Sequence, residues 1–313
     1  MNPPESELRH PTVLVTGPTR GLGRETALRL ARHPDRLGLL LLGRPGPALD
    51  SAAADCRRAG ADVVHAVAMD QADLASVRAA ATRVEEILSS QKLELCAIVA
   101  NAGIQTVDLH HRTRDGFELT FGVNVLGTHL LLQELSPLLA QGGRVVLVGS
   151  GTAEDRRKDG LVPVPVWEDP VLLAQPDRTH DDPDDLTAGR RAYSTSKLGT
   201  LYLAHAHQRH TRRDHQVDVF DPGMMPGTGL ARDASLVQRV GWNLLRAVAR
   251  WAPGMSTPRR SAVTLAAMAM GELGSSGGRY VHIDHDVDPS PTAFDEEREE
   301  RLWDAAEQLT SRA

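Results

Sequence analysis

Cysteine is scarce in this sequence, which holds only Cys56 and Cys96 among its 313 residues. Two cysteines build no disulfide framework, so a hydrophobic core must stabilise the fold, and we expect a reducing, cytoplasmic location. Long hydrophobic runs are lacking as well. The run Leu37–Leu42 is far shorter than the roughly 20 residues that span a bilayer, and the polar segment Met1–His10 resembles no signal peptide. These absences predict no stable insertion into a membrane.

An excess of positive charge is also missing. Lys and Arg total 35 against 41 Asp and Glu, which gives a formal net charge of −6. Nucleic-acid binders present a clustered basic face, so this balance predicts no nucleic-acid partner. No metal centre is expected either: of His205, His207 and His210 only the last two share a helix face, and no carboxylate completes a ligand set. We expect these histidines to be solvated.

A regular alternation of short apolar runs and helical patterns is what the sequence does contain. The apolar runs are typical of strands covered on both faces, and the spacers between them have the length of crossover helices. Further helices are expected at Pro258–Met270 and from Phe294 to near Leu309. The pattern predicts an α/β fold with a single doubly wound parallel sheet of the Rossmann type, with helices on both faces, and residues 1–313 as one domain. The expected strands are Val13–Val15, Leu37–Leu42, Val63–Val67, Leu95–Ala100, Val145–Val148, Val217–Phe220 and Tyr280–Ile283.

Two segments interrupt this alternation. Residues 151–191 contain five prolines and many charges of both signs, which is typical of a long functional or mobile loop inserted into a domain. Residues 224–256 hold Trp242, Trp251 and many aliphatic residues between arginines, and we interpret them as an amphipathic substrate lid. A permanently packed helix pair that covers the sheet is the alternative for residues 224–256.

A glycine-rich turn follows the first expected strand and opens the first helix. Its glycines let the backbone turn tightly and approach a pyrophosphate, which the N–H groups of the helix N-terminus then bind. The spacing Gly-x-x-x-Gly-x-Gly is longer than the commoner Gly-x-Gly-x-x-Gly, and a glycine-rich loop without a ligand is the alternative. We predict cofactor contacts from Gly17, Thr19, Arg20, Gly21, Leu22 and Gly23.

The end of the second strand indicates which dinucleotide is bound. NAD-selective folds place an acid there to bind the ribose 2′-hydroxyl, whereas this strand ends in Leu42-Gly43-Arg44. Arg44 and Arg20 offer two guanidinium groups to a 2′-phosphate, so NADPH or NADP+ is the expected cofactor, and solvated arginines are the alternative. Asp70 is placed to reach the adenine amino group. Asn101, Ala102 and Gly103 end the fourth strand at the same edge of the sheet.

A tyrosine and a lysine four residues apart are the candidates for proton transfer. Tyr193 and Lys197 begin an expected helix that runs to about His210, and residues four apart share a helix face. The ammonium and a cationic nicotinamide both favour the phenolate, so together they lower the pKa of the tyrosine. Ser150, at the end of the fifth strand, is placed to hydrogen-bond the reacting oxygen while Tyr193 exchanges the proton.

The order of these motifs resembles that of the short-chain dehydrogenase/reductase family over nearly the whole chain. The resemblance implies that Tyr193 is the general acid/base, that Ser150 polarises the carbonyl, and that Lys197 lowers the tyrosine pKa and holds the nicotinamide ribose. It also implies that Asn124 anchors a water in the proton relay. The motifs are Thr16-Gly17-x-x-x-Gly21-x-Gly23, Asn101-Ala102-Gly103, Asn124, Ser150, Tyr193-x-x-x-Lys197, and the carboxamide-binding Pro222, Gly223, Met224 and Thr228.

A narrower resemblance points to the retinol-dehydrogenase-like and protochlorophyllide-reductase-like branch. Arg114-Asp115-Gly116-Phe117-Glu118 before Asn124 is similar to this branch, whose members use NADPH on large apolar substrates. Leu198-Gly199 stands where the pigment-reducing enzymes have a cysteine, which disfavours photochemistry. The expected activity is therefore NADPH-dependent hydride transfer between nicotinamide and the carbonyl or alcohol of a bulky, mostly apolar small molecule. Reduction of an activated C=C bond, or a non-catalytic NADP(H)-binding regulatory role, is the alternative.

The segment between the serine and the tyrosine also bears on assembly. Many relatives have a shorter connection there and pair through the helices that flank it. Here 43 positions separate Ser150 from Tyr193, and the inserted residues are long enough to cover that pairing surface. We therefore expect a monomer rather than a homo-oligomer.

Overall fold

One sheet organises the computed structural model, which describes residues 9–154, 162–211, 214–225, 254–274 and 277–311. Its strand order is β3-β2-β1-β4-β5-β6-β7-β8. Strands β1 to β7 pair in parallel, and β8 returns antiparallel to β7. The predicted fold class is confirmed, with one antiparallel edge strand added to it. The strands are β1 (His10–Thr16), β2 (Gly38–Gly43), β3 (Val64–Ala68), β4 (Leu93–Ala100), β5 (Leu139–Val148), β6 (Gln216–Asp221), β7 (Tyr280–His282) and β8 (His285–Asp286).

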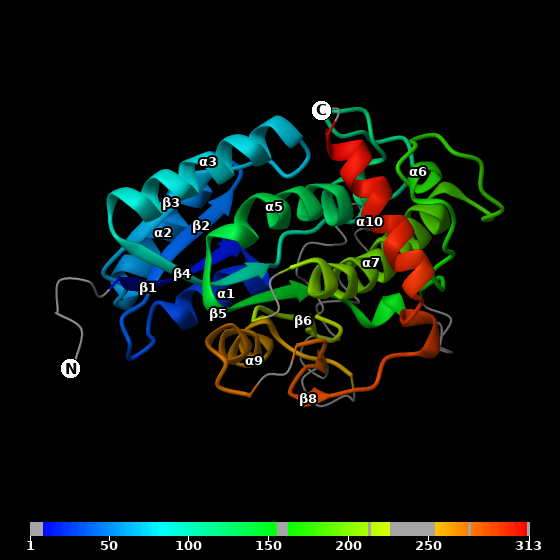
Figure 1. Cartoon of the computed structure of the whole chain (residues 1–313). Coiled ribbons are helices and arrows are strands. Elements are labelled where there is room, and N and C mark those ends of the chain that lie inside the picture. Colours follow the sequence, from blue (N-terminus) through cyan, green and yellow to red (C-terminus); the bar gives the residue numbers. More distant parts are fainter. Residues whose placement is uncertain (1–8, 155–161, 212–213, 226–253, 275–276, 312–313) are drawn as a thin grey trace.

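Helices cover both faces of the sheet (Figure 1). One face carries α1 (Gly21–Leu30), α2 (Pro47–Ala59) and α9 (Pro258–Met270), and the other carries α3 (Leu74–Ser90), α5 (Thr128–Leu135) and α7 (Asp185–His210). Helix α10 (Glu296–Ser311) packs across α7 and α5. Neighbouring strand residues such as Val13 and Leu14 belong to opposite cores, because successive strand side chains point to opposite faces. Burial on both faces explains why the strands are nearly continuous apolar runs.

The helix that carries the tyrosine and lysine begins earlier than expected. It starts at Asp185 rather than at Tyr193. The Asp184 carboxylate accepts the N–H of Thr187 at 2.7 Å and so caps the helix N-terminus. The insertion is therefore only partly a loop, and it also holds the short helix α6 (Pro170–Leu173), whose cap is Asp169.

A buried acid determines where the next helix begins. Helix α4 (Leu119–Phe121) starts directly after Glu118. The buried Glu118 side chain accepts the N–H groups of Thr120 at 2.8 Å and Phe121 at 2.7 Å, and this capping determines the start. A π-helical segment, Gly122–Gly127, joins α4 to α5.

The predicted lid lies mostly outside the described residues, although both of its ends are described. Met224 forms a parallel bridge with Met255, and the N–H of Met224 donates to the carbonyl of Gly254 at 3.0 Å. The described residues on either side of 226–253 therefore lie together, beyond the carboxyl end of β6. In the described ranges no helix has both the length and the apolar character needed to cross a membrane.

Candidate active site

The candidate site lies where the winding of the sheet reverses. Strand β1 has β2 on one side and β4 on the other, so the connections from these strands diverge at the carboxyl ends, where ligands bind in open α/β sheets. The glycine turn follows β1, Asn101 follows β4, Ser150 follows β5 and Pro222 follows β6. The fold thus brings the predicted motifs to one edge of the sheet.

The glycine turn has a backbone conformation that favours glycine. Gly17 has φ +64° and Gly21 has φ +56°, both in the left-handed region. A Cβ at Gly23 would overlap the carbonyl oxygen of Gly17 and the amide nitrogen of Asn101. The first turn of α1 also has no side-chain cap, since its N-cap residue Arg20 makes no capping hydrogen bond. Free N–H groups at a helix N-terminus suit a phosphate, so this turn fits a dinucleotide.

Four hydrogen bonds hold this turn against the end of β4. The Thr16 hydroxyl accepts the N–H groups of Asn101 at 3.0 Å and Ala102 at 2.9 Å. The Asn101 side-chain amide donates to the carbonyls of Thr16 at 2.9 Å and Gly17 at 3.3 Å. Asn101 therefore shapes the turn, which is a structural role that its motif alone did not indicate.

The two arginines predicted to bind a 2′-phosphate lie at the same edge. Arg20 is exposed in the glycine turn, and Arg44 is exposed directly after β2. A Cβ at Gly43 would lie 3.9 Å from Cγ2 of Thr19, so the turn and the end of β2 are neighbours. Asp70 is half-buried after β3, and its Oδ1 accepts the N–H of Ala72 at 3.0 Å.

Asn124 lies in the π-helical segment and is 3% exposed. Its Oδ1 accepts the N–H of Ile104 at 2.8 Å, and its Nδ2 donates to the carbonyl of Ile104 and to Oγ of Ser196, both at 2.9 Å. Single π-helical turns occur often at functional sites, because the extra residue re-aims a side chain. Asn124 thereby joins the loop after β4 to α7. Ser196 was missed from the sequence, although it stands inside the tyrosine–lysine motif.

Tyr193, Lys197 and Ser150 meet at the carboxyl end of β5. The buried Lys197 ammonium donates to the carbonyl of Val148 at 2.8 Å and lies 5.8 Å from the centre of the Tyr193 ring. The Ser150 hydroxyl is a hydrogen-bond partner of the Tyr193 phenol. A Cβ at Gly103 would be 3.5 Å from Nζ of Lys197, so the loop after β4 closes over the ammonium.

Burial has the largest effect on the pKa values of Tyr193 and Lys197. It raises the pKa of Tyr193 to about 12, although the hydrogen bond from Ser150 acts in the opposite direction. It lowers the pKa of Lys197 to about 8, while the Asp221 carboxylate raises it. The expected lowering of the tyrosine pKa counted a cationic nicotinamide beside the lysine, so it stays a prediction for the protein with its cofactor bound; in the chain alone desolvation of the phenolate dominates.

The carboxamide-binding motif is described only in part. Gly223 has φ +73°, and a Cβ there would lie 2.8 Å from Cδ1 of Ile283, so glycine is required. Pro222 is buried and Met224 half-buried, whereas Thr228 lies outside the described residues. Directly before this motif stands the buried Asp221, which the sequence analysis did not single out.

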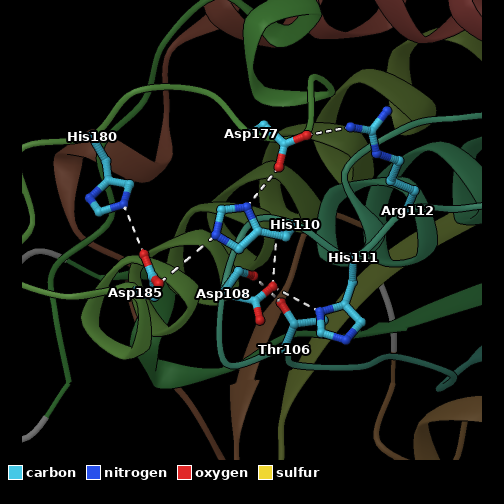
Figure 2. A network of polar contacts seen from close by, with 8 residues as sticks. All are labelled: Thr106, Asp108, His110, His111, Arg112, Asp177, His180 and Asp185. Carbon is cyan, nitrogen blue, oxygen red and sulfur yellow. Dashed lines mark hydrogen bonds and ion pairs between the residues drawn. The ribbon is translucent and has the colours of Figure 1, made fainter.

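A surface network ties the loop after β4 to the insertion. Figure 2 shows His110 between two carboxylates, at 2.7 Å from Asp177 and 3.9 Å from Asp185. His180 also approaches Asp185, at 3.6 Å, and Arg112 contacts Asp177. These side chains are mostly exposed, so they hold two loops together rather than forming a reaction centre.

His205 and His207 of α7 are largely buried, which corrects the expectation for these two, whereas His210 is exposed as expected. His207 is 3% exposed and shares a 2.8 Å hydrogen bond with Oγ of Ser136. His205 lies 2.8 Å from Glu299 and His210 lies 2.8 Å from Glu300, both on α10. The contacts of His205 and His210 depend on how α10 packs against α7, and the spacing of the histidines along α7 did not indicate this packing.

Comparisons with known proteins agree with this arrangement. A family profile described as short chain dehydrogenase matches residues 11–162. Polyprenol dehydrogenase of Mus musculus is 32% identical over 315 residues, which cover 95% of this chain and 83% of that protein. Retinol dehydrogenase 14 of Homo sapiens is 30% identical over 316 residues, covering 95% and 85%.

Solved structures share the fold at lower identity. A blue fluorescent protein from a metagenomic library, solved in complex with NADPH, superposes with a TM-score of 0.63 at 21% identity and covers 89% of this chain and 98% of its own. This likeness concerns the fold alone. The full-length matches among the relatives are what decide the family: the chain is a member of the short-chain dehydrogenase family of oxidoreductases, in its retinol-dehydrogenase-like branch.

Proposed function

We propose that this chain is an NADPH-dependent reductase of bulky, mostly apolar ketones or aldehydes, with Tyr193 as general acid/base. The observation that carries the proposal is the meeting of Tyr193, Lys197 and Ser150 at the end of β5, beside the glycine turn. A phenol hydrogen-bonded by a serine, next to a buried ammonium, is suited to giving a proton to a carbonyl oxygen. A purely regulatory NADP(H)-binding protein would not need this constellation.

The chain's own groups fit a nicotinamide dinucleotide. The uncapped N-terminus of α1 and the close approach at Gly23 suit the pyrophosphate, and Arg20 with Arg44 suits a 2′-phosphate. One structure of the same fold was solved with NADPH. When bound, the reduced nicotinamide supplies the hydride that the carbonyl carbon receives.

Four side chains would then serve the reaction. Tyr193 would donate its proton to the substrate oxygen, and Ser150 would hydrogen-bond the same oxygen. Lys197 would hold the ribose and favour the phenolate that remains. Asn124 bridges the loop after β4 and Ser196, where it would hold a water that returns a proton to the site.

The substrate class rests on sequence and on the relatives. Residues 226–253 include Trp242, Leu244 and Leu245. The described residues on either side of this segment, Met224 and Gly254, lie together beyond the carboxyl end of β6. Apolar residues stabilise a bound apolar substrate by about 25 cal/mol per Å² removed from water. The relatives are named for a polyprenol and for retinol, which are both long apolar alcohols.

The test is NADPH consumption with farnesal and retinal, compared with acetoin as a small polar ketone. We expect turnover of the bulky aldehydes to their alcohols and little reaction with acetoin. Product analysis distinguishes the alternative, since a saturated aldehyde would show reduction of the C=C bond. Acetoin as the best substrate would contradict the apolar class.

Cofactor choice provides a separate prediction. Replacing Arg44 with Asp should weaken NADPH binding by roughly ten- to a hundredfold and shift preference toward NADH, because a charge-assisted phosphate contact becomes a repulsion. Calorimetric titration of the variant and the wild type with NADPH and with NADH measures both affinities. The control is Arg29→Asp at the far end of α1, where the exposed arginine is remote from the glycine turn. Equal wild-type affinity for NADH and NADPH would contradict the assignment.

We also propose that the chain is a monomer, because the middle of α7 is covered on all sides. Every residue from Ser194 to Ala204 is buried within the single chain. From the insertion, Val166 donates its N–H to Oγ1 of Thr195 at 3.1 Å, and the ring of Trp167 meets that of Tyr202 edge-on at 4.7 Å. A helix buried all round has no face left for a partner helix.

Helix α10 contributes to the same cover. The ring of Trp303 stacks on His210 at 4.3 Å and lies edge-on to His129 of α5 at 4.8 Å. Light scattering at micromolar concentration should therefore give a mass near 33.9 kDa. A stable dimer or tetramer would show that another surface is used for assembly.

A further inference from the structure

A buried acid–imidazole pair lies next to the proposed site. Asp221 is the last residue of β6, and its side chain is 4% exposed. Its Oδ1 accepts the N–H of Gly223 at 2.9 Å, and its Oδ2 lies 2.7 Å from Nδ1 of His282 at the end of β7. A buried carboxylate is costly unless it is paired, so this arrangement indicates a function for the charge.

The register of the sheet places this carboxylate beside the reacting groups. Val148 pairs with Phe220, so Asp221 stands one residue beyond the carbonyl that binds the Lys197 ammonium. Its Oδ2 would be 3.0 Å from a Cβ at Gly151, which directly follows Ser150. A side chain at position 151 would therefore press against the carboxylate, which lies close to this turn.

The charge of Asp221 acts on both catalytic candidates. It raises the pKa of Lys197, whereas burial lowers this pKa by a larger amount. It also raises the pKa of Tyr193, which burial raises further. A negative charge stabilises an ammonium and destabilises a phenolate, so both directions follow from one group.

The imidazole of His282 connects this charge to the surface. Its side chain is 24% exposed, and its ring lies 5.6 Å from that of the exposed His285. Asp284, in the same turn, pairs with His285 at 3.1 Å and with Arg260 of α9 at 2.6 Å. Tyr193 and Lys197 of α7 face the pair from the other side, where the charge of Asp221 acts on both.

We propose that Asp221 and His282 are positioning residues that keep Lys197 protonated and set the pH range in which Tyr193 exchanges its proton. Asp221 supplies the counter-charge for the buried ammonium. The Nδ1–H of His282 holds the carboxylate in place by donating a hydrogen bond to Oδ2, which disperses its charge. This inference rests on the proposed function, because it assigns Lys197 to the cofactor and Tyr193 to proton transfer.

The test uses NADP+ binding across pH, which needs no substrate. In Asp221→Asn the Lys197 ammonium should lose its proton earlier, so NADP+ affinity should begin to fall about one pH unit lower than in the wild type. The pH dependence of retinol oxidation with NADP+ is the second readout. The acid limb of this pH profile should also move to lower pH, by about one pH unit, because the Tyr193 phenolate no longer lies near another negative charge.

The control is Asp218→Asn, which removes another buried carboxylate of β6. The buried carboxylate of Asp218 accepts the N–H of Arg279 at 2.9 Å. It is not among the groups that shift the pKa of Tyr193 or of Lys197. Asp218→Asn should keep the wild-type pH profile of NADP+ binding. An unchanged profile in Asp221→Asn as well would overturn the proposal.

His282→Gln keeps the proposal testable if Asp221→Asn does not fold. It leaves the carboxylate without the imidazole, so the fall in NADP+ affinity should move to higher pH, opposite to Asp221→Asn. A shift to lower pH, or none, would overturn the role of the pair. Failure of the proposed function is seen separately, as retinol oxidation that survives Tyr193→Phe.

Discussion

Replacing Tyr193 with Phe should lower turnover by about two to four decades while NADPH still binds. The substitution keeps the ring beside Lys197 and removes only the hydroxyl that Ser150 hydrogen-bonds. Without it no side chain in this position can give a proton to the substrate oxygen. Steady-state kinetics with farnesal, together with calorimetric titration of NADPH, separate the loss of turnover from any loss of binding.

The matched control is Tyr202→Phe on the same helix. The Tyr202 hydroxyl donates to the carbonyl of Thr292 at 2.6 Å and lies away from the carboxyl end of β5. Loss of this hydrogen bond should cost about 1 kcal/mol of the free energy of unfolding and leave turnover near the wild-type value. Near-normal turnover in Tyr193→Phe would remove the basis for assigning proton transfer to it.

Gly23→Ala should weaken NADPH binding by at least about a hundredfold. Alanine normally stabilises a helix by up to about 1 kcal/mol over glycine, but here its Cβ would overlap the carbonyl oxygen of Gly17 and the amide of Asn101. The turn must shift, and its N–H groups then no longer meet the phosphates. The melting temperature should fall as well, because the turn holds the end of β1 against β4.

Gly43→Ala is the control at the same edge of the sheet. The nearest atom to its added Cβ is Cδ of Pro18 at 3.4 Å, an ordinary contact. NADPH affinity should therefore stay within a few-fold of the wild type, as calorimetry can measure. Equal binding by Gly23→Ala and the wild type would mean that the dinucleotide does not lie on this turn.

Local chemistry was enough to predict most of the elements. Seven of the strands follow from apolar runs because strands covered on both faces consist mainly of apolar residues, and α9 has the predicted limits Pro258–Met270. Strand β8 was missed because its two residues, His285 and Asp286, are exposed and carry no apolar signal. The helix caps Glu118 and Asp184 were also not predicted, because several acidic residues stand near each helix start and the sequence does not show which of them is the cap.

The sequence by itself determined the sheet, the turn and the order of the catalytic candidates, because each depends on residues close together in the chain. Contacts between distant segments were decided only by the tertiary structure. Asp221 and His282 meet because β6 and β7 are neighbours, and His207 is buried where α7 packs beneath α10. The raised pKa of Tyr193 was likewise decided by the tertiary structure, because desolvation depends on all the chain around the phenol rather than on a motif.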